Sequence, residues 1–176
     1  MQVETVDYKA ADASTTLARS LRDTGFAVLA NHPITPDRIT EIYDGWGDFF
    51  AGKDKFDYAV QPPAHDGYFA FRSENAKDSP VKDLKEFFHV YPGCGLPAEL
   101  TEMTRQIYAD LNALGCELLA WIQAEAPASV TESLSMPLDT MMDDSEQSLL
   151  RILHYPPVSD AEPGAIRAAA HEDINL

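Results

Sequence analysis

The chain has 176 residues, of which 45% are hydrophobic and 24% are charged, a composition typical of one folded globular domain. Asp and Glu number 29 against 13 Lys and Arg, so the formal net charge at pH 7 is −16. An acidic chain of this kind repels phosphate backbones and anionic lipids, and no apolar stretch approaches the roughly 20 residues that span a bilayer, which argues against nucleic-acid-binding and membrane proteins.

The chain is predicted to begin with a helix and a short strand. Residues 12–24 have apolar side chains on one helical face, with Asp12 or Ser14 as the N-cap and Gly25 as the stop. The apolar run 26–30 follows and predicts a strand that ends at a turn.

A strongly amphipathic helix is predicted next. Thr35 and Pro36 supply an N-cap and a proline at the first helical position. Apolar residues then recur at three- and four-residue steps, at Ile39, Ile42, Tyr43, Trp46, Phe49 and Phe50. Residues 61–83 are rich in Pro, Gly, Asp, Ser and Lys and predict a long loop. This loop would carry three aromatic residues, Tyr68, Phe69 and Phe71.

The rest of the chain changes from helical to extended character. Residues 86–91 predict a strand, residues 100–122 one long helix, and residues 129–146 one or two shorter helices. From Ser148 onward the pattern predicts two strands, at 149–155 and 166–173. The predicted fold class is therefore α+β, with an α-rich region at residues 1–147 and the first strands of a sheet at 148–176. A sheet that starts so late leaves edges unpaired, which predicts a fragment or a chain that needs a partner.

The sharpest candidate for chemistry is His171-Glu172-Asp173. On a strand, His171 and Asp173 would point to the same side, while Glu172 would face away. One imidazole and one carboxylate are two of the three ligands in the facial triad that holds Fe(II) and leaves positions open for a co-substrate and oxygen. The alternative is a surface histidine and aspartate at a strand end.

Five segments in chain order share a pattern with one known family: Thr24–Ile34, Trp46–Phe50, Asp83–His89, Leu150–Pro157 and Ala170–Asp173. They are similar, in turn, to the GF-x-x-(L/V)-x-NHGI signature, the "FF" helix, the D-x-KE-x-(F/Y) segment, the (L/M)R-x-x-x-YPP strand and the H-x-D motif. The chain thus resembles the isopenicillin N synthase-like family of non-haem Fe(II), 2-oxoglutarate-dependent oxygenases. Pro33 stands at the position of the signature's usual glycine.

The resemblance implies a double-stranded β-helix, or jelly roll, behind an α-rich N-terminal region. It implies that His171 and Asp173 are metal ligands and that Tyr155 helps to bind the carboxylate of 2-oxoglutarate. The implied activity is oxidation of a small-molecule substrate by O2, whether by hydroxylation, desaturation or ring closure, since fold analogy alone does not fix the reaction.

The sequence also departs from the family pattern. Leu153 occupies the position where the family commonly has asparagine, two residues before Tyr155. The family's second iron histidine and its R-x-S pair lie beyond the H-x-D motif, and this chain ends three residues after Asp173. Neither His89 nor His154 matches the missing ligand, and both are expected to be structural. We therefore expect the intact parent protein to be the enzyme and the 176-residue chain to be inactive.

Two other functions are compatible with the sequence. The chain would act as an oxygenase-like binding module without turnover if it is itself the mature product, and its open sheet would then pair with a partner. A zinc hydrolase that uses His171 and Asp173 is less consistent, because no third ligand or general base has matching spacing. Cys94 and Cys116 show no metal or redox spacing and no secretory signal precedes them, so a cytoplasmic setting is expected.

Overall fold

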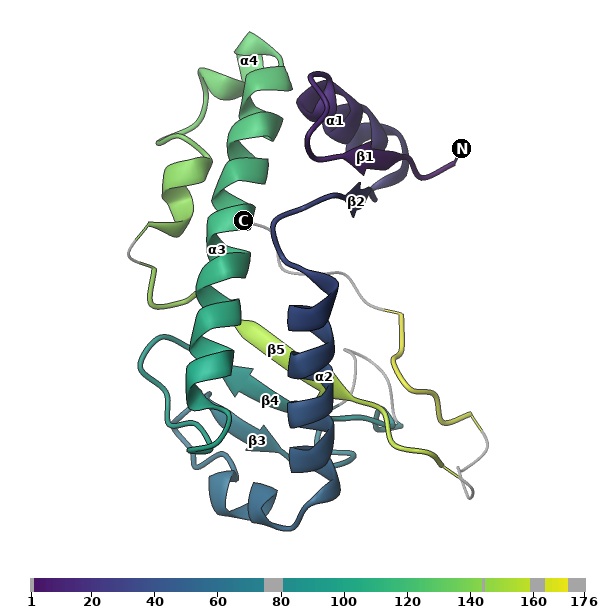
Figure 1. Ribbon diagram of the computed structural model, residues 1–176, viewed down its shortest axis with the longest axis vertical. Helices are drawn as coiled ribbons and strands as arrows, with labels where there is room; N and C mark the ends of the chain where they lie inside the picture. The colour runs from purple at the N-terminus through teal and green to yellow at the C-terminus, as the bar shows by residue number, and fades with distance from the viewer. Residues whose placement is uncertain (1, 75–80, 144, 159–163, 171–176) are drawn as a thin grey trace. The chain divides into compact units, whose positions relative to one another are not determined.

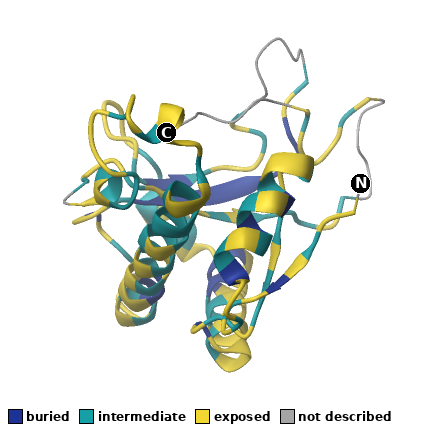
Figure 2. Cartoon of the chain, turned by 90° about the horizontal axis from the view of Figure 1, so that it is seen from above, coloured by how far each residue is buried: buried dark blue, intermediate teal, exposed yellow. Residues whose placement is uncertain are grey.

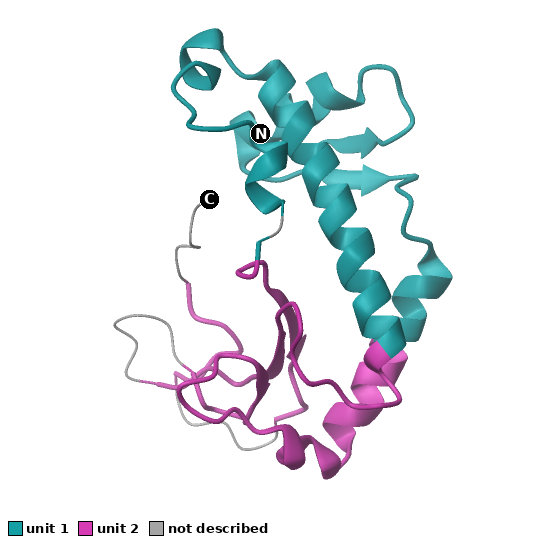
Figure 3. Cartoon of the chain, turned by 90° about the vertical axis from the view of Figure 1, so that its left-hand side faces the viewer, with its two compact units in different colours: residues 1–42, 102–145 teal, residues 43–101, 146–176 magenta. Residues whose placement is uncertain are grey.

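The computed structural model describes residues 2–74, 81–143, 145–158 and 164–170 (Figure 1). These residues form two compact units, each built from two separate parts of the chain (Figure 3). Unit 1 comprises residues 1–42 and 102–145, and unit 2 comprises residues 43–101 and 146–176. The division at residue 147 stays a prediction for the protein as a whole.

Unit 1 contains a two-stranded parallel sheet. Strand β1 (Thr5–Asp7) pairs with β2 (Val28–Ala30), and helix α1 (Ala13–Thr24) connects them. The helix ends as expected at Gly25, which adopts φ 78° and donates its N–H to the carbonyl of Leu21. Asp12 is the N-cap residue, but its side chain makes no capping hydrogen bond. Strand β1 was not predicted.

The core of unit 1 lies between α1 and the long helix α3 (Thr101–Glu125). Its buried centre consists of Val6, Ala13 and Leu17. Three apolar side chains of α3 pack against this centre, namely Leu118, Trp121 and Ile122. Two short helical segments follow α3, which are α4 (Ala128–Thr131) and η2 (Asp139–Met142). The predicted helices in this part of the chain are thus confirmed.

Unit 2 is built on a three-stranded antiparallel sheet. The strands lie in the order β3 (Gly67–Phe69), β4 (Glu86–Val90) and β5 (Leu150–His154). The central strand β4 is buried along its whole length (Figure 2). Parallel and antiparallel strands together with the helices make the chain α+β, as predicted.

One face of this sheet packs on helix α2 (Pro36–Ala51). Thr35 caps the helix as expected, because its hydroxyl accepts a hydrogen bond from the N–H of Arg38 at 3.3 Å. The apolar stripe of the helix brings Trp46, Phe49 and Phe50 to the sheet, and Trp46 meets Phe88 with ring centroids 5.0 Å apart. Figure 1 shows the C-terminal half of α2 beside the three strands.

Two sequence predictions are wrong in unit 2. Residues 61–83 are not one long loop, because Gly67–Phe69 pair with β4 as strand β3, after a 3₁₀ helix η1 at Asp54–Tyr58. The described residues of the second predicted C-terminal strand, 166–170, form a bend and irregular backbone instead of a strand. Both segments are held by contacts to residues distant in sequence, which local patterns do not reveal.

None of the helices in the described part of the chain has the length and apolar character that a membrane span requires.

Gly67 occupies a position that no other residue fits. It has φ 104°, and a Cβ atom built there would lie 2.6 Å from the backbone oxygen of Tyr58. We expect Gly67→Ala to lower the free energy of unfolding by about 1–3 kcal/mol, since both the backbone conformation and the close approach become strained. Urea unfolding checks this. Gly93→Ala is the matched control, because Gly93 has φ 78° but no atom within 4 Å of the added Cβ, and an equal loss in both variants would contradict the steric argument.

Candidate active site

The sheet of unit 2 presents two chemically different faces. Residues that lie opposite each other in an antiparallel pair share a face, and successive residues alternate. Tyr68, Phe88 and Ile152 therefore lie on the face that packs on α2, here called the helix face. Phe69, Phe87 and Leu153 lie on the other, here called the second face.

A buried carboxylate organises the helix face. Glu86 is only 3% exposed and accepts three hydrogen bonds. They come from Tyr68 Oη at 2.5 Å, Lys55 Nζ at 2.9 Å and His154 Nδ1 at 2.7 Å. The ring of His154 also stacks on Phe50, with centroids 5.1 Å apart. His154 is thus a structural residue, as predicted.

These hydrogen bonds control the charge of Glu86. Burial alone would raise the pKa of its carboxyl group, but the bonds from Tyr68, His154 and Lys55 outweigh burial and hold the pKa below its ordinary value. Burial and the neighbouring carboxylate raise the pKa of Tyr68. Glu86 is therefore ionised and Tyr68 is neutral at pH 7, which matches the directions of their hydrogen bonds.

Aromatic rings and one histidine line the second face. Phe69 and Phe87 stack with centroids 4.6 Å apart, and the guanidinium of Arg151 lies 4.9 Å from the centre of the Phe87 ring. His89 is 7% exposed and packs beside both rings. Its Nδ1 lies 2.9 Å from the carbonyl oxygen of His65, so Nδ1 carries the proton and Nε2 holds a lone pair. Buried Nε2 has no hydrogen-bond partner among the described residues.

The protonation of His89 gives a testable pH dependence. Burial lowers the pKa of His89 below its ordinary value of 6.5, outweighing the hydrogen bond to His65. Because the unfolded chain binds this proton more readily, the contribution of His89 to stability is complete above pH 6.5 and is lost as the pH falls below it. We expect His89→Gln to lose this part of the pH dependence in urea unfolding, and imidazole ¹⁵N spectra to show the Nδ1–H tautomer. A wild-type ring already protonated at pH 6.5 would contradict the assignment.

A chain of alternating charges lies at the start of β4. The ammonium group of Lys85 bonds to Asp83 at 3.0 Å and to Glu74 at 2.9 Å. Glu74 in turn lies 3.4 Å from the guanidinium of Arg151 on β5. Burial alone would lower the pKa of Lys85, but its two carboxylate partners outweigh burial and raise it, so Lys85 is charged. We call Glu74, Asp83, Lys85 and Arg151 the ion network.

The chain segment before the H-x-D motif is tied to this network. The backbone N–H of Leu84 donates to the carbonyl of Ile166 at 3.0 Å. The backbone N–H of Ala169 donates to Asp83 Oδ1 at 3.2 Å. Two hydrogen bonds therefore hold residues 166–169 against residues 83 and 84, just before strand β4.

The predicted site residues are only in part within the described structure. Tyr155 follows the last residue of β5 and is half-buried. His171 and Asp173 lie outside the described residues. Among the residues that are described, no three His, Cys, Asp or Glu side chains come together to hold a metal ion. Sequence reasoning did not identify the ion network. The charged residues just before strand β4 were the signal that could have indicated it.

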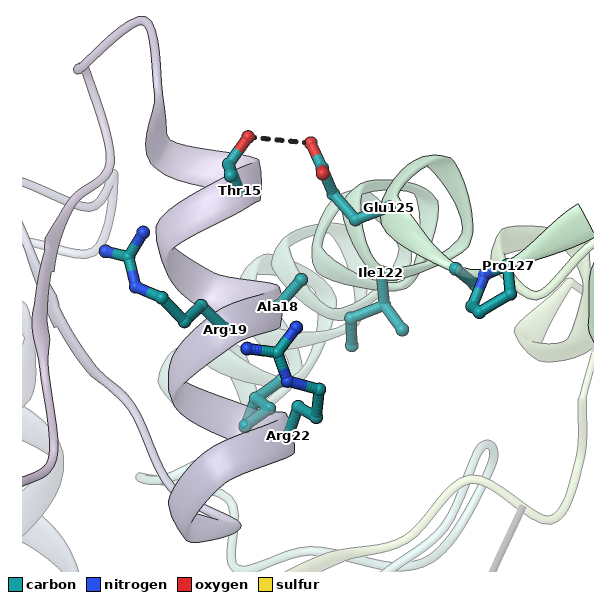
Figure 4. A pocket seen from close by; sticks show the side chains of 9 residues that line it. Thr15, Ala18, Arg19, Arg22, Ile122, Glu125 and Pro127 are labelled. Atoms are coloured by element: carbon teal, nitrogen blue, oxygen red, sulfur yellow. Dashed lines mark hydrogen bonds between the residues drawn. The ribbon is translucent and has the colours of Figure 1, made fainter. Parts of the chain in front are cut away.

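Two hollows occur elsewhere in the described structure. One, of about 300 Å³ in unit 2, is lined by His65, Asp66, Tyr91, Pro92, Gly93, Cys94, Glu146 and Gln147. The other, of about 470 Å³ in unit 1, lies between α1 and the end of α3 (Figure 4). In the second hollow, Thr15 bonds to Glu125, while Arg19 and Arg22 are paired with Glu4 and Asp23. Neither hollow contains a predicted site residue.

Comparison with protein families gives one match that covers more than half of the chain. Residues 3–108 match the family model described as "non-haem dioxygenase in morphine synthesis N-terminal". This range includes α1, the sheet of unit 1, α2 and strand β4. The matched range thus contains the segments that gave the first three motifs of the sequence.

Individual proteins give the same indication. A protein of Shewanella oneidensis described as a "Putative oxygenase" is 45% identical in sequence. Its crystal structure matches with a TM-score of 0.87, covering 100% of this chain and 63% of that one. A protein of Caulobacter crescentus described as a "putative 2OG-Fe(II) oxygenase family protein" is 29% identical with a TM-score of 0.69, covering 98% of this chain and 61% of that one. The proline hydroxylase buaE of Petromyces alliaceus is 29% identical over 180 residues, covering 90% and 54%. The chain thus spans between half and two thirds of the length of these relatives.

Proposed function

The chain belongs to the non-haem dioxygenase family whose N-terminal region matches residues 3–108, and from this membership we propose that the protein is an Fe(II)- and 2-oxoglutarate-dependent oxygenase. The substrate in this proposal is a small molecule and the oxidant is O2. A cytoplasmic location and a jelly-roll fold for the catalytic part belong to the same proposal. The relatives assigned as oxygenases support it.

The proposed iron ligands are His171 and Asp173. Imidazole and carboxylate are donors that suit Fe(II) in the facial triad, which needs one more histidine. His154 does not supply it, because its ring lies on the helix face, where it stacks on Phe50 with centroids 5.1 Å apart. His89 is a second unsuitable candidate, because its ring is enclosed among Phe69 and Phe87. As the family resemblance implies, the proposal assigns the third position to a further histidine of the whole protein.

The proposal rests most on how the segment before these ligands is held. Ile166 and Ala169 hydrogen-bond to Leu84 and Asp83, directly beside the central strand. Ala169 precedes His171 by two residues, so two fixed backbone points lie immediately before the proposed ligands. A metal site needs ligand side chains whose orientations are fixed by the rigid structure around them.

Tyr155 is proposed to bind a carboxylate of 2-oxoglutarate. Side chains alternate along β5, with Arg151 and Leu153 on the second face and His154 on the helix face. With an extended backbone at residue 155, the same alternation would place the Tyr155 side chain on the second face, away from Glu86. Its phenolic O–H would then donate to the co-substrate carboxylate, and Arg151 would add positive charge on the same face.

Bound Fe(II) would supply the oxidative chemistry in which 2-oxoglutarate and O2 give succinate and CO2 while the substrate is oxidised. The residues of this chain would orient the co-substrate through Tyr155 and exclude water with the rings of Phe69 and Phe87. They would also keep the ligand-bearing segment in place through Asp83.

A turnover assay tests the proposed function. Full-length protein with Fe(II), O2 and 2-oxoglutarate labelled in its C1 carboxyl group should release labelled CO2 and form succinate in equal amounts, with L-proline as the first small-molecule probe. The release should require all three additions, and Tyr155→Phe should raise the KM for 2-oxoglutarate by about tenfold, the effect of losing one charge-assisted hydrogen bond. Release of CO2 no higher than in metal-free protein would overturn the proposal.

A further inference from the structure

We propose that the hollow of about 470 Å³ between α1 and the end of α3 binds a short apolar peptide whose two ends are free. The hollow lies within unit 1 and contains none of the residues proposed to bind iron or 2-oxoglutarate, so this site is separate from the proposed oxygenase site. Its volume is within the range of small-molecule sites in proteins.

The floor of the hollow is apolar. Five residues form it, which are Ala18 and Leu21 on α1, Ile122 on α3, and Ala126 and Pro127 directly after α3. Leu21 and Ile122 are partly buried and pack against the core of unit 1. The floor is thus the accessible edge of a packed core, and the apolar side chain of a ligand would be stabilised by covering it.

One end of the hollow carries a negative charge in a fixed position. Glu125 is the last residue of α3, and its Oε1 accepts hydrogen bonds from the hydroxyl groups of Ser14 and Thr15, both at 2.9 Å. The C-terminal end of a helix adds partial negative charge beside this carboxylate. Because the carboxylate is already held in place, it is a good acceptor for the ammonium group of a ligand.

A positive charge lies about two helical turns away on α1. Arg22 follows Thr15 by seven residues, which is roughly 10 Å along the helix axis. Figure 4 shows Glu125 beside Thr15, Arg22 further along α1, and the side chains of Ala18 and Ile122 between them. The hollow therefore has opposite charges toward its two ends and apolar side chains in the middle.

Arg22 is better placed than Arg19 to bind the carboxylate of a ligand. Arg19 binds Glu4 through two hydrogen bonds of 2.7 Å, so its charge is neutralised. Arg22 bonds through Nε to the adjacent Asp23 at 2.8 Å, and its side chain is 73% exposed. An exposed pair of this kind adds little stability, and the terminal nitrogens of the guanidinium can bind a carboxylate.

This arrangement fits a zwitterion better than a simple anion or cation. An extended peptide rises about 3.3–3.6 Å per residue, so the terminal charges of a tripeptide are roughly 10 Å apart. This separation matches the spacing of Thr15 and Arg22 along α1. The ammonium end of the peptide would bind Glu125, its carboxylate end would bind Arg22, and its central side chain would cover the floor.

Amide spectra of the ¹⁵N-labelled full-length protein test the inference with the tripeptide Ala-Leu-Ala as the probe. The amides of Ala18 and Ile122 should show shifts that saturate below about 10 mM peptide. Acetylating the amino end or amidating the carboxyl end should each weaken binding by about tenfold, because each removes one charge-assisted contact. No saturable shift at this concentration, or equal binding of free and blocked peptides, would overturn the inference.

Two neutral variants assign the charges to the two ends of the peptide. Arg22→Gln should weaken binding of the free tripeptide by about tenfold and leave binding of the amidated tripeptide unchanged. Glu125→Gln should cause the same loss for the free tripeptide and leave the acetylated one unchanged, while its amide oxygen can still accept the two hydroxyl groups. A variant that weakens binding of the free and the matching blocked peptide equally would contradict the assignment.

Lys9→Gln and Glu102→Gln are the matched controls. They change the net charge of unit 1 by the same amounts, but neither residue lines the hollow, and Glu102 lies in the first turn of α3. Both should bind the free tripeptide as the wild type does. Losses equal to those of Arg22→Gln and Glu125→Gln would show that only net charge matters and would overturn the inference.

Discussion

Glu86→Ala should lower the free energy of unfolding by about 3–5 kcal/mol, the largest effect on stability that we expect from one substitution in this chain. Glu86 is the shared acceptor for Tyr68, Lys55 and His154. Removing it leaves the Tyr68 phenol without its acceptor, and leaves the Lys55 ammonium group with only the carbonyl of Phe50, in a region that water hardly reaches. Urea unfolding followed by circular dichroism measures the loss.

The pH dependence gives an independent measurement of the same cluster. The pKa of Glu86 lies below its ordinary value of 4.5 in the folded chain, so its stabilising contribution is complete above pH 4.5 and is lost as the pH falls through the lowered pKa. Glu86→Gln should lose this part of the acid sensitivity. Glu41→Ala is the control, because Glu41 forms an exposed pair with Arg38 at 3.7 Å and should cost less than about 1 kcal/mol. Equal losses for Glu41→Ala and Glu86→Ala would contradict the account.

His171→Ala and Asp173→Ala should each weaken Fe(II) binding by at least about 100-fold, the largest functional effect we expect. Each substitution removes one of three protein donors, and a metal ion with two remaining donors loses much of its binding free energy. Anaerobic equilibrium dialysis of the full-length protein against Fe(II) measures this.

The matched control for these variants is His32→Ala. His32 lies in the turn between β2 and α2, and its removal changes the number of histidines without changing the proposed site. Fe(II) binding should stay at the wild-type level in this variant. A loss of binding in His32→Ala equal to that in His171→Ala would show that the measurement reports folding or nonspecific binding.

Much of the helical structure could be predicted from local sequence. The threonine cap and the apolar stripe from Ile39 to Phe50 define α2 without help from the rest of the chain, and Gly25 marks the end of α1. These features depend on neighbours within a few residues, so one sequence contains enough information to predict them.

The remaining features depend on pairing across long stretches of chain. Strand β3 has three residues and closely follows Pro62 and Pro63, so only its pairing with β4 makes it a strand. Strand β1 likewise exists through its pairing with β2. The ion network joins Glu74 to Arg151, which lies 77 residues further along the chain. The iron ligands were predicted from motif and family resemblance, and they stay a prediction because they lie outside the described residues.

The most direct test of the central claim is anaerobic addition of 2-oxoglutarate to the full-length protein loaded with Fe(II). Iron and co-substrate bound in one site should produce a metal-to-ligand charge-transfer band in the visible spectrum. The account predicts that this band saturates at one 2-oxoglutarate per chain in the wild type and is absent from His171→Ala and Asp173→Ala. A wild-type protein that binds Fe(II) and shows no such band, or an equal band in both variants, would contradict the account.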